Sequence, residues 1–351
     1  MLRSERVIMI QTDTTSGLKC CCRLGFLLLL LFSCLNSTRG QEVVPTPSPQ
    51  TDSQTIGNDE TVRIETDLVD LAVTVFSNDP LRVVGQLGQQ DFIVFEDGVQ
   101  QEISLFASAE TPFDLVLLID LSASTKDKLN LIRKSATSFV EAARPTDRIG
   151  ILTFTDKFEV VSPLTFERED LKLRIKKMKK PSGGTNFWDA LRYVVETVLN
   201  PANTSRRSAV VMMTDGVDNA LPDVPGEGSR IRFEDLLGLV GHSDSIFIPI
   251  YLDTEREMIE ERRIYSAHAY QIARLQLGML ANESGSKLYY AKKVEDLKNV
   301  YQQVVRDLST VYSIGYRPIN KARDGSWRSI NVRLNNRVDL SARARRGYFA
   351  R

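Results

Sequence analysis

Residues 114–124 read DLVLLIDLSAS, and this stretch decides the fold class. Residues 115–119 are all large aliphatics, which is typical of a strand buried on both faces of a parallel sheet. Three polar side chains, Asp120, Ser122 and Ser124, follow the strand directly. In open parallel sheets, ligands bind at the carboxyl ends of the strands. The stretch therefore predicts an α/β domain with a candidate site directly after its first strand.

The chain beyond this stretch alternates between strand-like and helix-like patterns. Further short apolar runs predict strands at residues 149–154, 209–214, 246–252 and 287–290. Apolar residues recurring every three or four positions predict helices at residues 129–143, 171–178, 190–198, 257–281 and 294–308. Repeated strand–helix alternation predicts a doubly wound, mostly parallel, Rossmann-like sheet with helices on both faces. We assign residues 111–310 to this domain.

The segments on either side have the two-residue period of β-strands. Val69, Leu71 and Val73 alternate with other residues in the first flank, residues 59–110, and Asp97-Gly98 is a strong hairpin signal between apolar runs. Alternation returns in the second flank, residues 311–351. Because neither flank has enough strands to be stable alone, we predict that the two pair into one β-sandwich.

The N-terminus has the pattern of a secretory signal peptide, which we assign to residues 1–40. Residues 24–35 are apolar after a positively charged stretch, and the run is too short to span a bilayer as a helix. Small residues at Thr38 and Gly40 suit cleavage before Gln41. The alternatives are an uncleaved amphipathic anchor or a lipid anchor through Cys34. Residues 41–58 are polar and proline-rich, as in a flexible linker. The pattern predicts an extracytoplasmic location, periplasmic or secreted.

Composition limits the classes of partner. All four cysteines lie within residues 1–40, so the predicted mature chain has no disulfide. That chain would carry 40 basic and 43 acidic side chains, counted over residues 41–351. A nearly balanced charge gives no electrostatic reason to expect nucleic acid or an anionic membrane surface as a partner.

Two further loops contribute to the candidate site. A glycine-rich turn, residues 182–185, ends in Thr185, and the predicted strand at residues 209–214 is followed by Asp215. Carboxylate and hydroxyl oxygens are hard ligands, which suit Mg²⁺, Mn²⁺ or Ca²⁺ better than zinc. The three loops therefore offer oxygen ligands for one divalent cation.

The order D-x-S-x-S, G-G-T and T-D-G resembles the metal-ion-dependent adhesion site of von Willebrand factor A domains, over residues 113–308. The resemblance implies that Asp120, Ser122, Ser124, Thr185 and Asp215 surround the metal, Mg²⁺ or else Mn²⁺ or Ca²⁺. It also implies that an Asp or Glu carboxylate of a protein partner completes the coordination. Residues 91–98 and 346–348 resemble, more loosely, VWFA-related proteins described from acidobacteria.

Other interpretations stay open. A D-x-S-x-S string alone is typical of a helix N-cap, and Asp127, Asp218 and Asn219 suit loop and cap roles better than metal ligation. Two histidines outside any recognisable motif and the lack of a P-loop argue against an enzyme. We therefore expect metal-dependent protein binding, in adhesion or in assembly of an extracytoplasmic complex. The alternatives are a structural module whose metal only stabilises the fold, and a metal-dependent hydrolase.

Overall fold

The computed structural model describes residues 68–79, 84–199, 206–260 and 267–350. The predicted signal peptide and linker lie outside these ranges. Within them, no helix combines the length and the apolar character needed to cross a membrane.

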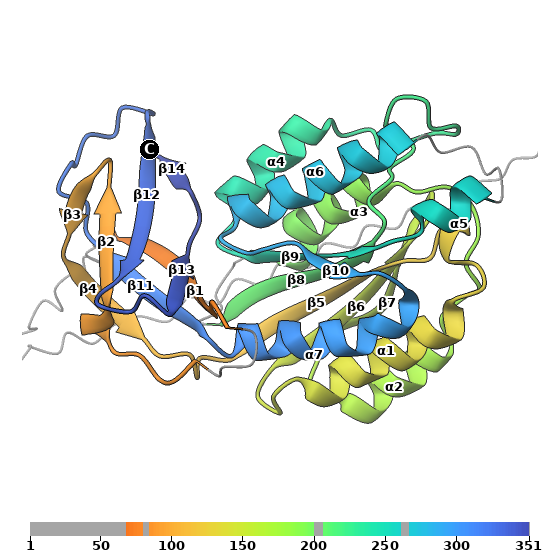
Figure 1. The fold of residues 1–351 in the computed structure, drawn as a ribbon, viewed down its shortest axis with the longest axis horizontal. Coiled ribbons are helices and arrows are strands. Elements are labelled where there is room, and N and C mark those ends of the chain that lie inside the picture. The colour runs from red at the N-terminus through yellow and green to blue at the C-terminus, as the bar shows by residue number, and fades with distance from the viewer. Residues whose placement is uncertain (1–67, 80–83, 200–205, 261–266, 351) are drawn as a thin grey trace, which may run out of the picture. The chain divides into compact units, whose positions relative to one another are not determined.

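A six-stranded sheet with the order β10-β9-β8-β5-β6-β7 forms the centre of the α/β domain (Figure 1). Its strands are β5 (Phe113–Asp120), β6 (Arg148–Phe154), β7 (Phe158–Thr165), β8 (Arg207–Thr214), β9 (Ile246–Leu252) and β10 (Tyr289–Ala291). All neighbours pair in parallel except β7, which is antiparallel to β6. Every residue of β5 is buried, as its apolar run predicts. The predicted fold class is confirmed.

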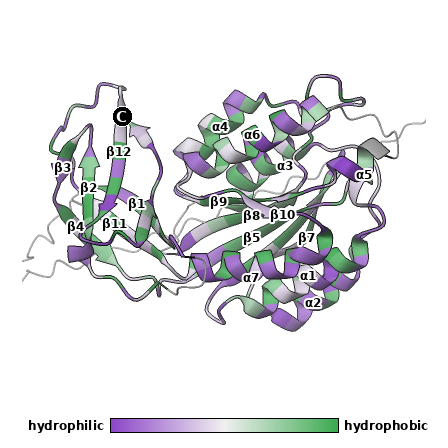
Figure 2. Ribbon diagram, in the orientation of Figure 1, coloured by the Kyte–Doolittle hydropathy of each residue, from purple (hydrophilic) through white to green (hydrophobic). Residues whose placement is uncertain are grey.

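Helices cover both faces of this sheet (Figure 1). One face carries α1 (Leu129–Ala142), α2 (Arg168–Lys176) and α7 (Leu297–Leu308), and the other carries α3 (Phe187–Tyr193), α4 (Phe233–His242) and α6 (Ala267–Glu283). Alternate residues of β5 enter the two cores: Leu117 packs on the α1 side and Leu118 on the α3 side. Burying one such side chain contributes about 1.5–3 kcal/mol. In Figure 2 the strands are hydrophobic and the helices carry the hydrophilic residues, consistent with a core on each face of the sheet.

The element boundaries differ from prediction in places. Helix α4 and the edge strand β7 were not predicted. The helix predicted at residues 257–281 corresponds to two helices, α5 (Glu255–Glu260) and α6, on either side of residues 261–266. Short helical segments also occur at η1 (Gln89–Asp91), η2 (Ala123–Thr125), η3 (Val194–Val198) and η4 (Val294–Asp296).

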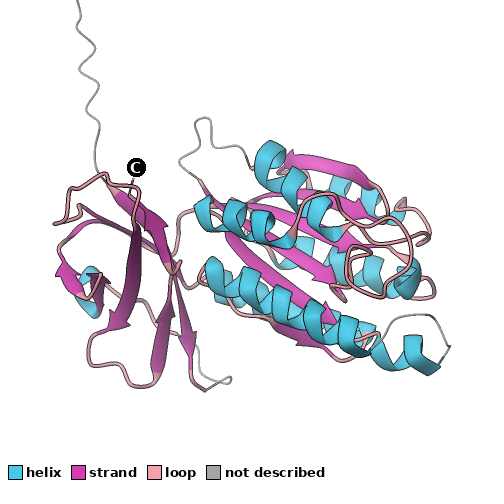
Figure 3. Ribbon diagram, turned by 90° about the horizontal axis from the view of Figure 1, so that it is seen from above, coloured by secondary structure: helices cyan, strands magenta, loops and turns pink. Residues whose placement is uncertain are grey.

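The flanking segments form two four-stranded sheets, with orders β13-β1-β11-β4 and β14-β12-β2-β3. Their strands are β1 (Val69–Ser77), β2 (Phe92–Glu96), β3 (Val99–Gln101), β4 (Ile103–Ala107), β11 (Val311–Tyr316), β12 (Trp327–Leu334), β13 (Leu340–Arg343) and β14 (Gly347–Phe349). Each sheet mixes strands from both flanks, since β1 pairs with β11 and β2 with β12. The predicted sandwich is therefore present, and Figure 3 shows its strands beside the helix-rich domain.

Two details explain how the sandwich is joined. Asp97 and Gly98 have φ values of 49° and 80°, which suit a tight two-residue hairpin turn between β2 and β3. The chain after β3 then changes sheet, because β4 pairs with β11. Between the sheets, the buried carboxylate of Glu96 accepts hydrogen bonds from the hydroxyls of Tyr316 (2.7 Å) and Tyr348 (2.9 Å).

Candidate metal site

The first loop of the candidate site begins where β5 ends. Asp120 is fully buried, and its Oδ1 accepts the backbone N–H of Ser122 at 2.9 Å. Its Oδ2 accepts the hydroxyl of Thr214, the last residue of the neighbouring strand β8, at 2.6 Å. The hydroxyls of Ser122 and Ser124 lie 3.2 Å apart and both residues are buried. The turn thus brings a carboxylate and two hydroxyls together.

The second loop lies against the first through backbone hydrogen bonds. The N–H of Ser182 donates to the carbonyl of Leu121 at 3.0 Å, and the N–H of Ala123 donates to the carbonyl of Gly183 at 3.2 Å. Gly183 has a φ of +83°, a conformation that favours glycine. This turn leads into Thr185, which is 2% exposed.

Asn219 fixes the position of Thr185. Its Oδ1 accepts the Thr185 N–H at 2.8 Å, its own N–H donates to the Thr185 carbonyl at 2.9 Å, and its Nδ2 donates to the carbonyl of Pro225 at 2.7 Å. A Cβ on Gly184 would lie 2.7 Å from Asn219 Nδ2, so the close approach requires glycine. Asp218 accepts the N–H of Trp188 at the start of α3, a capping role of the kind predicted.

The third loop follows β8 and supplies Asp215, which is 2% exposed. Its Oδ1 accepts the N–H of Val217 at 3.1 Å, and its Oδ2 accepts the hydroxyl of Thr254 at 2.7 Å. Thr254 lies just beyond the carboxyl end of β9 and is fully buried. The neighbouring strands β5, β8 and β9 therefore all send side chains to one edge of the sheet.

Two buried carboxylates close together are electrostatically unfavourable. Burial, followed by the negative charge of Asp215, raises the pKa of Asp120 well above its usual value. Burial also raises the pKa of Asp215, against hydrogen bonds from Thr254 and from the backbone of Val217. A cation between the two carboxylates would remove this conflict.

The donor set fits a hard divalent cation. The described residues contain no group of three or more His, Cys, Asp or Glu side chains that could hold a metal ion. The candidate site has only two such side chains, Asp120 and Asp215, and its other candidate ligands are the hydroxyl residues Ser122, Ser124 and Thr185. Oxygen-only donors of this kind suit Mg²⁺, Mn²⁺ or Ca²⁺.

Sequence reasoning gave Asn219 only a general loop or cap role and gave Thr214 and Thr254 no role, although all three hold candidate ligands in place. Thr214 and Thr254 each donate a hydroxyl hydrogen bond to one of the carboxylates, and Asn219 fixes the second loop. The rule that polar residues after buried strands gather at one edge would have found Thr254, which follows β9. The contact between Asn219 and Thr185 has no comparable signal in the sequence.

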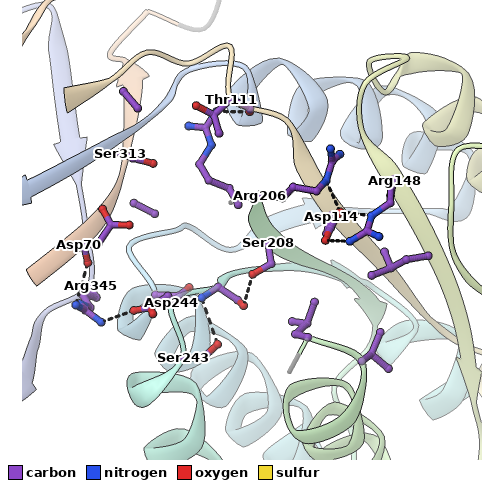
Figure 4. Close-up of a pocket in the computed structure, with 18 of the residues that line it drawn as sticks. Asp70, Thr111, Asp114, Arg148, Arg206, Ser208, Ser243, Asp244, Ser313 and Arg345 are labelled. Carbon is purple, nitrogen blue, oxygen red and sulfur yellow. Dashed lines mark hydrogen bonds and ion pairs between the residues drawn. The ribbon is translucent and has the colours of Figure 1, made fainter. Parts of the chain in front are cut away.

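A cavity of about 480 Å³ lies at the other end of the sheet, where β5 and β8 begin (Figure 4). Asp114 pairs there with Arg148 and with Arg206, whose Nε atoms lie 2.8 and 2.7 Å from its carboxylate. Asp244 pairs with Arg345 at 2.8 Å. The cavity therefore lies away from the candidate metal site, which is at the opposite ends of the same strands.

The sequence model of the von Willebrand factor type A domain matches residues 114–303, which is more than half of the chain. Matrilin-1 from Gallus gallus is 26% identical over 208 residues, covering 54% of this chain and 42% of Matrilin-1. Members of this family mediate metal-dependent protein interactions.

Solved structures with a related fold are distant in sequence. Proximal thread matrix protein 1 from the mussel byssus, with a zinc-occupied MIDAS motif, has a TM-score of 0.46 at 16% identity, over 61% of this chain and 49% of that one. The vWF domain of the type V pili tip protein Mfa5 from Porphyromonas gingivalis has a TM-score of 0.43 at 12% identity, over 56% and 94%. The chain spans less than half the length of Matrilin-1 and of the mussel protein.

Proposed function

Because the chain belongs to the von Willebrand factor type A domain family, we propose that it binds a protein partner through a divalent cation. The cation would be held by Asp120, Ser122, Ser124, Thr185 and Asp215, directly or through water. The observation that carries the proposal is that the buried side chains of Asp120, Ser122, Ser124 and Asp215 gather at one edge of the sheet. The buried Thr185 follows a turn that is hydrogen-bonded to the first loop. Mg²⁺ is the first candidate, with Mn²⁺ and Ca²⁺ as alternatives.

The residues of the candidate site have different roles in holding the cation. Asp120 and Asp215 supply negative charge, and Thr214 and Thr254 hold these carboxylates in position by donating to one oxygen of each. The three hydroxyl ligands are neutral. The only negative charge that the candidate ligands can offer the cation therefore comes from the two carboxylates. When bound, the cation would offer a coordination position to an Asp or Glu carboxylate of the partner. A charge-assisted contact of this kind can anchor an otherwise ordinary interface.

The experiment pans a random peptide-display library against the immobilised chain in Mn²⁺ and elutes the bound peptides with a chelator. We expect the enriched peptides to share an Asp or Glu residue, and we expect Asp→Asn or Glu→Gln in the peptide to abolish binding. Enriched peptides that bind equally well in chelator, or without any acidic residue, would contradict the proposal.

Two controls separate the alternatives. If the metal only stabilises the fold, chelation lowers the melting temperature of the chain and no acidic peptide is enriched. If the chain is a hydrolase, purified protein with Mn²⁺ turns over a phosphoester such as p-nitrophenyl phosphate, and Asp120→Ala abolishes the turnover. Under our proposal the chain stays folded in chelator and shows no turnover.

The proposal includes an extracytoplasmic location. It is supported by the apolar run at residues 24–35 and by the positive charge that precedes it. N-terminal sequencing of the protein made in its host tests this point. We expect a start at Gln41, whereas a lipid-modified Cys34 would support anchoring instead.

A further inference from the structure

Lys128 lies beside the first loop of the candidate site, immediately before α1. Its ammonium donates a hydrogen bond to the carbonyl oxygen of Ser124 at 3.1 Å. Only 13% of its side chain is exposed, so water screens its charge weakly. Ser124 is one of the candidate ligands, and its hydroxyl lies 3.2 Å from that of Ser122. A positive charge therefore lies next to the place where the cation would be held.

The charge of this lysine acts on the buried carboxylate of Asp215. Burial raises the pKa of Asp215, and the positive charge of Lys128 is among the interactions that lower it. While no cation is bound, a lysine in this position stabilises the negative charge of Asp215. Once a cation is bound, the same lysine repels it.

The negative charge of Glu257, on α5, offsets the positive charge of Lys128. Its carboxylate forms an ion pair with the Lys128 ammonium, and 57% of its side chain is exposed. Just before α5, Thr254 donates its hydroxyl to Asp215 at 2.7 Å, so residues 254–257 are joined to the site at two points. The Lys128–Glu257 pair also lines a cavity of about 270 Å³ whose wall includes Ser124.

We propose that Lys128 lowers the affinity of the site for its cation, and that Glu257 limits this effect by pairing with the lysine. The inference rests on the proposed metal site and adds a residue pair that sets how tightly the cation is bound. Because Glu257 is exposed at a cavity beside the site, a partner group that contacts it changes the field at the cation. Partner contact and cation affinity are thereby linked in both directions.

A purely structural role for Lys128 predicts the opposite sign. If its hydrogen bond to Ser124 only holds the loop in shape, removing the ammonium loosens the ligands and weakens cation binding. If its charge opposes the cation, removing the ammonium strengthens binding. The sign of the change in affinity therefore decides between the two roles.

The test titrates Mn²⁺ into the purified full chain by isothermal titration calorimetry. Lys128→Met keeps the aliphatic stem and removes the charge, and we expect it to bind Mn²⁺ about tenfold more tightly than wild type. Glu257→Gln, on an exposed residue, leaves Lys128 unbalanced and should bind several-fold more weakly. Lys126→Met is the matched control: its exposed side chain in the same loop is screened by water, so the affinity should stay within about twofold of wild type.

The melting temperature in chelator gives a second readout. Lys128→Met should melt below wild type without metal, because buried Asp215 loses a stabilising charge. Its melting temperature should rise by more than that of wild type when Mn²⁺ is added. Weaker or unchanged binding by Lys128→Met overturns the inference and leaves the metal site standing. If Lys128→Met does not fold, unchanged or tighter binding by Glu257→Gln overturns it. A folded wild type that binds no ion refutes the proposed function itself, and the inference with it.

Discussion

Replacing Asn219 with alanine removes the side chain that fixes the second loop of the candidate site. The Thr185 N–H, in a residue that is 2% exposed, would lose its acceptor at 2.8 Å. An unsatisfied buried N–H costs about 1–3 kcal/mol. The lost bond to Pro225, an exposed residue, costs less because water can replace it. We therefore expect the loop to be destabilised by about 2 kcal/mol.

The free energy of cation binding should become less favourable by the same amount, because Thr185 must be in place when the cation is bound. A loss of about 2 kcal/mol corresponds to a roughly thirtyfold rise in Kd. Isothermal titration of Mg²⁺ into wild type and Asn219→Ala measures it, with Asn282→Ala, an exposed position at the end of α6, as the control. A folded Asn219→Ala chain with a Kd within threefold of wild type would refute the role of Asn219.

Three further predictions concern single side chains. A methyl group in Gly184→Ala would lie 2.7 Å from Asn219 Nδ2, so this variant should bind Mg²⁺ more weakly than wild type. Because the clash is with Asn219, calorimetry should show that the Gly184→Ala, Asn219→Ala double variant binds Mg²⁺ no more weakly than Asn219→Ala alone. Glu96→Ala leaves the hydroxyls of Tyr316 and Tyr348 without their acceptor, and urea denaturation should show a loss of about 3 kcal/mol with Mg²⁺ affinity unchanged. Burial of Asp114 opposes its ionisation, but hydrogen bonds from Arg148 and Arg206 outweigh burial and lower its pKa. Asp114→Asn should therefore cost about 3 kcal/mol near neutral pH. A carboxyl whose pKa is lowered in the folded state stabilises the fold at pH values above its unfolded pKa of about 3.9. Urea titrations should therefore show that the difference in unfolding free energy between wild type and Asp114→Asn is constant down to about pH 4 and shrinks below it.

The parallel strands could be predicted because burial on both faces produces continuous apolar runs. The edge strand β7 has no such run, since most of its residues are exposed or half-buried. Helix α4 contains Gly238 and Gly241, and glycine lowers helix propensity by about 1 kcal/mol per residue. Its contacts with α6 and α3 compensate for that weakness, and those contacts are not visible in a short sequence window.

The candidate ligands could be named because each follows a strand or a glycine-rich turn in a recognisable string. The residues that support them could not, since their roles depend on contacts between distant segments. Thr254 meets Asp215 across 39 positions of sequence, and Lys128 meets Glu257 across 129. The pairing of β1 with β11 was predicted only as the joining of two flanks, because neither register nor strand order follows from alternation alone.

Calorimetric titration of Mg²⁺ and Mn²⁺ into the purified chain tests the metal site most directly. Asp120→Ala removes a candidate ligand, and Asp127→Ala, an exposed acid in the same loop, is the matched control. Our account predicts one ion bound by wild type and by Asp127→Ala, and none by a folded Asp120→Ala chain. A folded wild type that binds neither ion would contradict the account and leave the five residues with a structural role.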